Sequence, residues 1–71
     1  MTALLLRVNG EPFTTEPGTT IADLVAVVLG GDDPKGVAVA VDRCVVPHSE
    51  WARTPARAGS LVEVVSAAAG G

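Results

Sequence analysis

The fold is decided by residues 4–15, whose sequence is LLLRVNGEPFTT. Apolar side chains alternate along Leu4–Val8, and because Arg7 belongs in water the alternation predicts a strand with one face toward a core. Asn9-Gly10 is the strongest sequence signal for a two-residue hairpin turn, since both residues tolerate positive φ. A second strand over Glu11–Thr15 should therefore pair with the first.

The second strand should lie at a sheet edge, because Pro12 has no N–H to donate, and Phe13 should turn inward. A helix is predicted next, with Thr20 as N-cap and Asp23 completing a capping box. Gly30-Gly31 should end it. Its core stripe follows the i, i+3, i+4, i+7 spacing and consists of Ile21, Leu24, Val25 and Val28.

Three further strands are expected, over Val37–Val41, Cys44–Val46 and residues 61–65. Asp42-Arg43 should form the turn between the first two of these. A single helical turn should follow Pro47, with Ser49 as its cap, and residues 54–59 should be irregular.

This order of elements predicts an α+β fold, a mixed four- to five-stranded sheet packed on one helix. In the last strand Glu63 must face water, so Val62 and Val64 should point at the helix. The same parity places Leu61 and Val65 on the outer face, beside Leu5 and Arg7. Apolar side chains gathered there favour a docking site over ordinary exposed surface.

Composition limits the classes of protein that the chain can belong to. Its 71 residues, 48% of them hydrophobic, make one small domain of modest stability. Net charge is −3, the five basic residues are dispersed and aromatics are scarce, which argues against nucleic-acid binding. One cysteine predicts neither a disulfide nor a metal site, and no apolar run suits a signal peptide or a membrane span. We expect a cytoplasmic domain.

The end of the sequence, Gly70-Gly71, is the feature that suggests chemistry. With one His, one Cys and no phosphate-binding loop, the chain itself is not expected to be an enzyme. A frayed terminus is the simplest reading of residues 67–71. However, glycine lacks a Cβ, so a flexible tail after a domain of residues 1–66 could thread a narrow channel in a partner enzyme and present the Gly71 carboxylate.

These features together resemble the ubiquitin-like β-grasp sulfur carriers, and most closely the ThiS family of thiamine biosynthesis. The most specific run is residues 45–54, VVPHSEWART. The chain departs from the family in Ala58-Gly59-Ser60, where members usually have an acidic turn. The other matching segments are residues 8–11, 20–24 and 37–41 and the closing diglycine.

The resemblance implies that an adenylyltransferase similar to ubiquitin-activating enzymes uses ATP to adenylate Gly71. Sulfur from a donor such as a cysteine desulfurase then gives a C-terminal thiocarboxylate, which a thiazole synthase consumes. Gly70 and Ala69 would thread the partner's channel, while Leu5, Arg7, Leu61 and Val65 would bind the partners. No bound cofactor or metal is implied.

Two alternatives stay open at this stage. A small subunit of molybdopterin synthase shares the fold and the diglycine end, although such chains are usually longer. The other alternative is a β-grasp interaction module or protein modifier, whose tail is inert or forms an amide with lysine.

Overall fold

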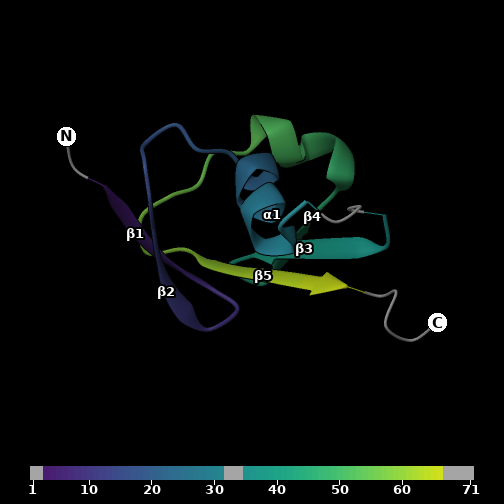
Figure 1. Ribbon diagram of the computed structural model, residues 1–71, viewed down its shortest axis with the longest axis horizontal. Coiled ribbons are helices and arrows are strands. Elements are labelled where there is room, and N and C mark those ends of the chain that lie inside the picture. The colour runs from purple at the N-terminus through teal and green to yellow at the C-terminus, as the bar shows by residue number, and fades with distance from the viewer. Residues whose placement is uncertain (1–2, 32–34, 67–71) are drawn as a thin grey trace.

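The computed structural model describes residues 3–31 and 35–66. Their strands form one mixed sheet in the order β2-β1-β5-β3-β4, and the helices α1 and η1 lie together on one side of it (Figure 1). The α+β prediction of a mixed sheet on one α-helix is confirmed. The elements are β1 (Leu4–Val8), β2 (Glu11–Thr15), α1 (Ile21–Leu29), β3 (Val37–Val41), β4 (Cys44–Val46), the 3-10 helix η1 (His48–Arg53) and β5 (Leu61–Ser66).

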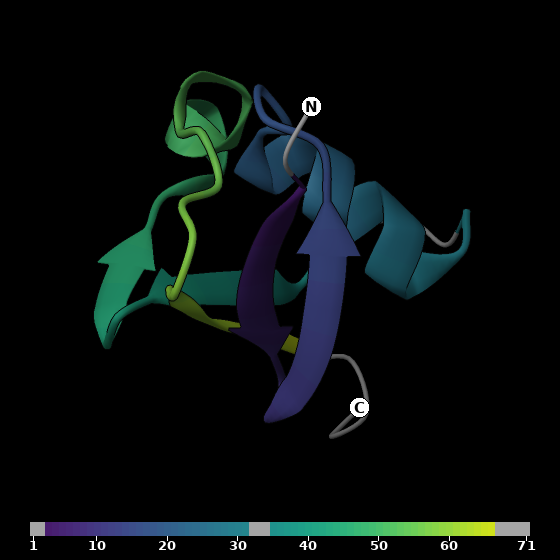
Figure 2. The same ribbon diagram turned by 90° about the vertical axis from the view of Figure 1, so that its left-hand side faces the viewer.

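The first hairpin forms as its sequence predicts. Val8 pairs with Glu11 across a two-residue turn in which Asn9 and Gly10 have φ of 53° and 83°. Figure 2 shows β1 and β2 side by side, with β2 outermost. The edge position suits Pro12, because no neighbouring strand needs its missing N–H.

β5 lies in the middle of the sheet, parallel to β1 and antiparallel to β3. Val62 and Val64 are buried and Glu63 is exposed, which confirms the predicted parity. The strand continues one residue beyond the expected end, because Ser66 pairs with Val37.

α1 begins with the predicted capping box. The Asp23 N–H donates to Thr20 Oγ1 over 3.2 Å, and the Thr20 N–H donates to Asp23 Oδ2 over 3.0 Å. Gly30 ends the helix with φ of 63°, a left-handed conformation that favours glycine.

One residue of the predicted helix stripe is misplaced. Val28 is 37% exposed, while Leu29 packs against the core. The reason is that α1 contacts η1 as well as the sheet. Trp51 of η1 faces the flank of α1 that carries Val25 and Leu29 across a small cavity, so burial in the last turn shifts toward that flank.

η1 also differs from its prediction. It begins at His48 rather than after a Ser49 cap, and no side chain caps it. Pro47 starts the turn with φ of −60°, and its carbonyl accepts from the Glu50 N–H over 2.8 Å. Trp51 is 4% exposed, and its indole N–H donates to the Val46 carbonyl over 2.9 Å. It therefore joins the buried core, against which the half-buried Phe13 also packs.

Candidate functional site

The sheet face opposite the helices carries the predicted partner-binding residues. Leu5 is 60% exposed, Leu61 45% and Val65 59%, and Arg7 is also exposed. Their side chains point outward because each alternates with a buried neighbour on β1 or β5. No other described element covers this face (Figure 1).

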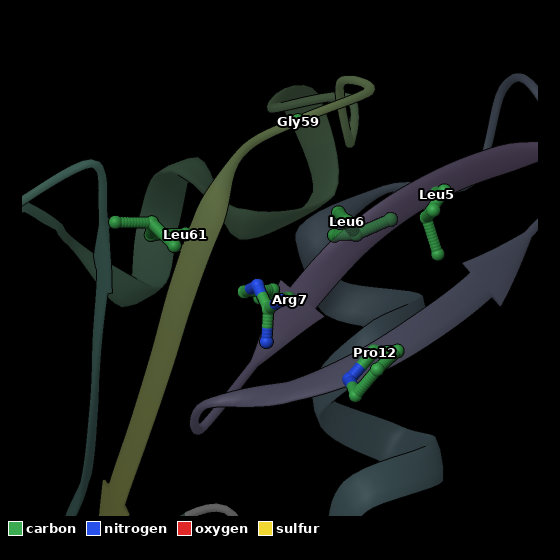
Figure 3. Close-up of a pocket in the computed structure, with 6 residues that line it drawn as sticks. All are labelled: Leu5, Leu6, Arg7, Pro12, Gly59 and Leu61. Carbon is green, nitrogen blue, oxygen red and sulfur yellow. The ribbon is translucent and has the colours of Figure 1, made fainter.

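Three of the four predicted residues meet around one hollow. Leu5, Arg7 and Leu61 line an open cavity of about 260 Å³, and Pro12 closes one side, with Arg7 between Leu61 and Pro12 (Figure 3). The hollow exists because β1 pairs with β5 only at its last two residues.

Before these two residues, β1 is hydrogen-bonded to the loop that precedes β5 and not to β5 itself. The Gly59 N–H donates to the Leu5 carbonyl over 2.8 Å, and the Arg7 N–H donates to the Ser60 carbonyl over 3.0 Å. Gly59 has φ of 82°, so the chain turns sharply into β5 at this point. The backbone polar groups of β1 are thereby satisfied while the outer face stays indented.

A second hollow of about 220 Å³ adjoins the first. Arg7 and Leu61 line both, and Arg43 and Glu63 complete the charged part of the second. Sequence reasoning missed Arg43 because it placed this residue only as half of a turn. The signal that could have found it is an arginine where a two-residue hairpin usually has glycine.

Val65 lies apart from the other three. It is four residues beyond Leu61 on β5, about 13 Å along the strand, and pairs with Ala38. Val45 of β4, which is 74% exposed and pairs with Ala40, is on the same face but two strands away from Val65. Val45 was also missed, although alternation within β4 places it on this face.

The helix side carries an apolar cavity of about 220 Å³ between α1 and η1. His48 and Trp51 meet edge to face beside it, with ring centroids 4.4 Å apart. The burial of Trp51 and its hydrogen bond to Val46 give this residue a structural role, so its place beside the cavity needs no binding function.

Within residues 3–31 and 35–66, no three His, Cys, Asp or Glu side chains are grouped as a metal site would require. Cys44 is a free, exposed thiol. None of the described helices has the length and apolar character needed to cross a membrane.

The predicted reactive end lies outside the described residues. This applies to Gly71 and to the threading residues Gly70 and Ala69. The structure gives the point from which these residues extend, which is the end of β5 at Ser66. That point is at the opposite end of β5 from Leu61.

Comparison with known proteins supplies the family context. The model of the ThiS family matches residues 6–71, which includes the closing diglycine. A crystal structure of a thiamine biosynthesis protein (ThiS) from Geobacter metallireducens superposes with a TM-score of 0.71 at 23% sequence identity, covering 89% of this chain and 93% of that one. No curated protein matches the chain. The ubiquitin-like β-grasp fold expected from the resemblance is confirmed.

Proposed function

The chain belongs to the ThiS family, and on that premise we propose that it is a sulfur carrier protein of thiamine biosynthesis. The observation that carries the proposal is a family match that runs through the β-grasp domain to Gly70-Gly71. In this role the chain is a co-substrate of other enzymes and does no catalysis of its own.

The chemistry takes place at the Gly71 carboxylate. A carboxylate is a poor electrophile, so a partner adenylyltransferase first joins it to AMP, and pyrophosphate leaves from ATP. When the nucleophile is sulfide, it attacks the acyl carbon, AMP departs and a thiocarboxylate is left. In the cell the sulfur would come from a persulfide formed by a donor such as a cysteine desulfurase. Its outer sulfur would displace AMP to give an acyl disulfide, and a thiol would then cleave the S–S bond, releasing the thiocarboxylate and leaving a disulfide on the donor side. The thiocarboxylate is the form that a thiazole synthase would consume.

The small side chains at the end of the sequence fit this chemistry. An active site that must admit a polypeptide end and ATP together favours a narrow entry. Gly70 and Gly71 add no Cβ there, and Ala69 adds only a methyl group. We assign Gly71 as the acceptor of AMP and sulfur, and Gly70 and Ala69 as the residues that thread the channel.

The outer sheet face is the proposed docking surface for both partners. Leu5 and Leu61 supply exposed apolar area beside Arg7, and Val65 supplies more at the tail end of β5. Exposed apolar residues gathered on one face of a domain this small favour an interaction surface. Docking there would leave α1 and η1 facing away from the partner.

The test is the intact mass of the protein after incubation with the adenylyltransferase of the source organism, ATP and inorganic sulfide. Sulfide displaces AMP directly, so the unidentified sulfur donor is not needed. We expect a mass gain equal to one oxygen replaced by one sulfur. The gain should disappear without ATP. If the mass never changes, the inert-tail alternative replaces the sulfur-carrier proposal.

The pathway is tested in a second step. The thiocarboxylate form is offered separately to a thiazole synthase and to the large subunit of a molybdopterin synthase, each with its other substrates. Return of the carrier to its original mass with the thiazole synthase alone supports thiamine biosynthesis. Return with the molybdopterin enzyme alone would transfer the proposal to that pathway.

A further inference from the structure

The two tight hairpins of the sheet have turns with the same positive-φ backbone conformation but different residues. Asn9-Gly10 joins β1 to β2, and Asp42-Arg43 joins β3 to β4, each as a two-residue turn between paired strands. All four residues have positive φ, and Arg43 is at 71° where Gly10 is at 83°. Side chains with a Cβ are strained in this conformation, and glycine is not.

Arg43 therefore occupies a position where glycine would make the fold more stable. Among the residues that the structure describes, none forms a hydrogen bond or ion pair with the Arg43 side chain. The described part of the fold therefore gains no interaction that offsets the backbone strain. Strained residues that the local structure does not need occur preferentially at functional sites.

The strained turn holds Arg43 beside the partner-binding face. The Asp42 N–H donates to the Leu61 carbonyl over 2.7 Å, and Asp42 Oδ1 accepts from the Leu61 N–H over 2.9 Å. On the other side of β5, Arg7 is the register partner of Leu61. Leu61 thus lies between two arginine-bearing segments that are fixed by backbone hydrogen bonds.

Arg7 and Arg43 line the same hollow, and their guanidinium groups have N–H donors to spare. Arg7 Nη1 donates to the Gly10 carbonyl over 3.1 Å, which orients its guanidinium but uses few of its five N–H groups. Glu63 lines this hollow as well, so two positive charges and one negative charge face it, and the apolar hollow lined by Leu5 and Leu61 adjoins it.

We propose that the hollow between Arg7 and Arg43 receives a carboxylate side chain of the adenylyltransferase, with an apolar side chain of the same segment seated in the neighbouring hollow beside Leu5. This rests on the proposed function and names the partner chemistry of its docking surface. Arginine suits the task, because its planar group binds carboxylates through two parallel hydrogen bonds. Glu63 sets the register, because it repels a carboxylate that is displaced toward it.

The charge of the whole chain affects how the carrier would approach an acidic docking segment. At a net charge of −3 the protein repels an acidic surface at long range. A pair of arginines on one face then determines which way the carrier approaches an acidic docking segment. We expect the association to weaken with salt, since the pair is exposed.

The experiment compares Arg43→Gly with wild type and with Arg53→Gln. Arg53 is an exposed arginine of η1, so its loss makes the same change in net charge on the other side of the molecule. Each protein is melted and then assayed as substrate of the adenylyltransferase by ATP–pyrophosphate exchange, at about 0.1 M and about 1 M salt, where the screening length falls from about 10 to about 3 Å.

Arg43→Gly should raise the melting temperature by a few degrees and yet raise the KM for the carrier about three- to tenfold at low salt, with kcat unchanged. At high salt the difference in KM should shrink. Arg53→Gln should match wild type in KM. A gain in stability together with a loss in binding is a result that a merely structural role would not give.

The inference is overturned when wild type is adenylated normally and Arg43→Gly has an unchanged KM, or when Arg53→Gln raises the KM equally. A lower melting temperature for Arg43→Gly also overturns it, since the side chain would then stabilise the fold. If wild type itself supports no exchange, the sulfur-carrier proposal fails, and this inference fails with it.

Discussion

Asn9 has two separate tasks in the structure. It adopts φ of 53° in the first hairpin turn, which asparagine tolerates better than most residues. Its side chain also reaches across to the central strand, where Oδ1 accepts from the Val64 N–H over 2.8 Å. β1 has ended at this level, so the side chain replaces a backbone carbonyl that β5 would otherwise lack.

The two tasks can be separated by substitution. Asn9→Gly keeps the turn and removes the acceptor, and should cost about 1–2 kcal/mol of unfolding free energy. Asn9→Ala loses the acceptor and also strains the backbone, so it should cost about 1 kcal/mol more. Urea denaturation measures both. Asn9→Asp retains an acceptor and should be the mildest of the three, and equal losses for glycine and aspartate would show that the hydrogen bond contributes nothing.

Trp51 gives a second prediction at this scale. Trp51→Phe keeps an aromatic ring in the core but leaves the Val46 carbonyl without its indole donor. We expect a loss of about 1–3 kcal/mol of unfolding free energy, from the lost donor and the smaller ring. Denaturation followed by circular dichroism measures it, because the variant has no tryptophan fluorescence. His48→Ala is the control for the ring contact, and a loss as large as that of Trp51→Phe would assign the effect to that contact instead.

Among the elements, β5 tests the architecture most directly because it pairs with both β1 and β3. Val64 is 9% exposed on its inner face, and Val65 is 59% exposed on its outer face. Val64→Asp should unfold the domain, since an unpaired charge in a small core costs more than about 4 kcal/mol. Val65→Asp should cost about 1 kcal/mol, through strand propensity alone. Melting curves decide, and two similar curves would contradict the register.

Elements whose signals are local could be predicted from the sequence. The Asn9-Gly10 turn, the capping box at Thr20 and the strand parity around Glu63 each depend on a few consecutive residues. The burial of Trp51 and the exposure of Val28 could not, because both depend on η1 packing against a flank of α1 far away in the sequence.

The same distinction applies to the candidate site. Leu5, Arg7 and Leu61 were predicted to share a face, because alternation alone determines which way a strand residue points. Their meeting in one hollow depends on the register between β1 and β5, which no local pattern encodes. Arg43 joins them only because Asp42 binds both backbone groups of Leu61.

At the scale of the whole molecule, we expect substitutions on the proposed docking face to weaken partner binding while the domain stays folded. Leu5→Glu and Val65→Glu place a charge at opposite ends of the exposed sheet face, so both should leave the domain folded and lower the melting temperature by no more than a few degrees. Both should weaken the complexes with the adenylyltransferase and the thiazole synthase, by about tenfold or more. Titration calorimetry measures this.

A matched control is Val27→Glu. Val27 is 64% exposed on α1, on the other side of the molecule, so its charge should alter neither complex. If all three folded variants bind like wild type, the sheet face is not the docking surface.

The length of residues 67–71 would link the proposed docking face to the proposed acceptor, Gly71. β5 carries the chain about 17 Å from Leu61 to Ser66, and five extended residues add at most about 18 Å. A partner that holds the carrier near Leu61 therefore needs its ATP site within about 35 Å of that contact. This distance is the maximum reach of the natural tail, and a longer tether would still reach an ATP site within it.

The final prediction uses this difference between tether and terminus. Inserting Gly-Ser between Ser66 and Ala67 lengthens the tether but keeps the diglycine end, and it should reduce the rate only slightly, because closure entropy grows slowly with length. Adding one residue after Gly71 displaces the reactive carbon from the adenylating site and should abolish the reaction. Gly70→Val should do the same by widening the threaded segment.

The measurement is the gain of one sulfur for one oxygen in the intact mass, after identical incubations with the adenylyltransferase, ATP and sulfide. All three variants should melt like wild type, because the changes lie beyond β5. Sulfur transfer to the extended chain at the wild-type rate would remove Gly71 as the acceptor, and loss of transfer in the Gly-Ser insertion would show that the partner measures the tether as well as the terminus.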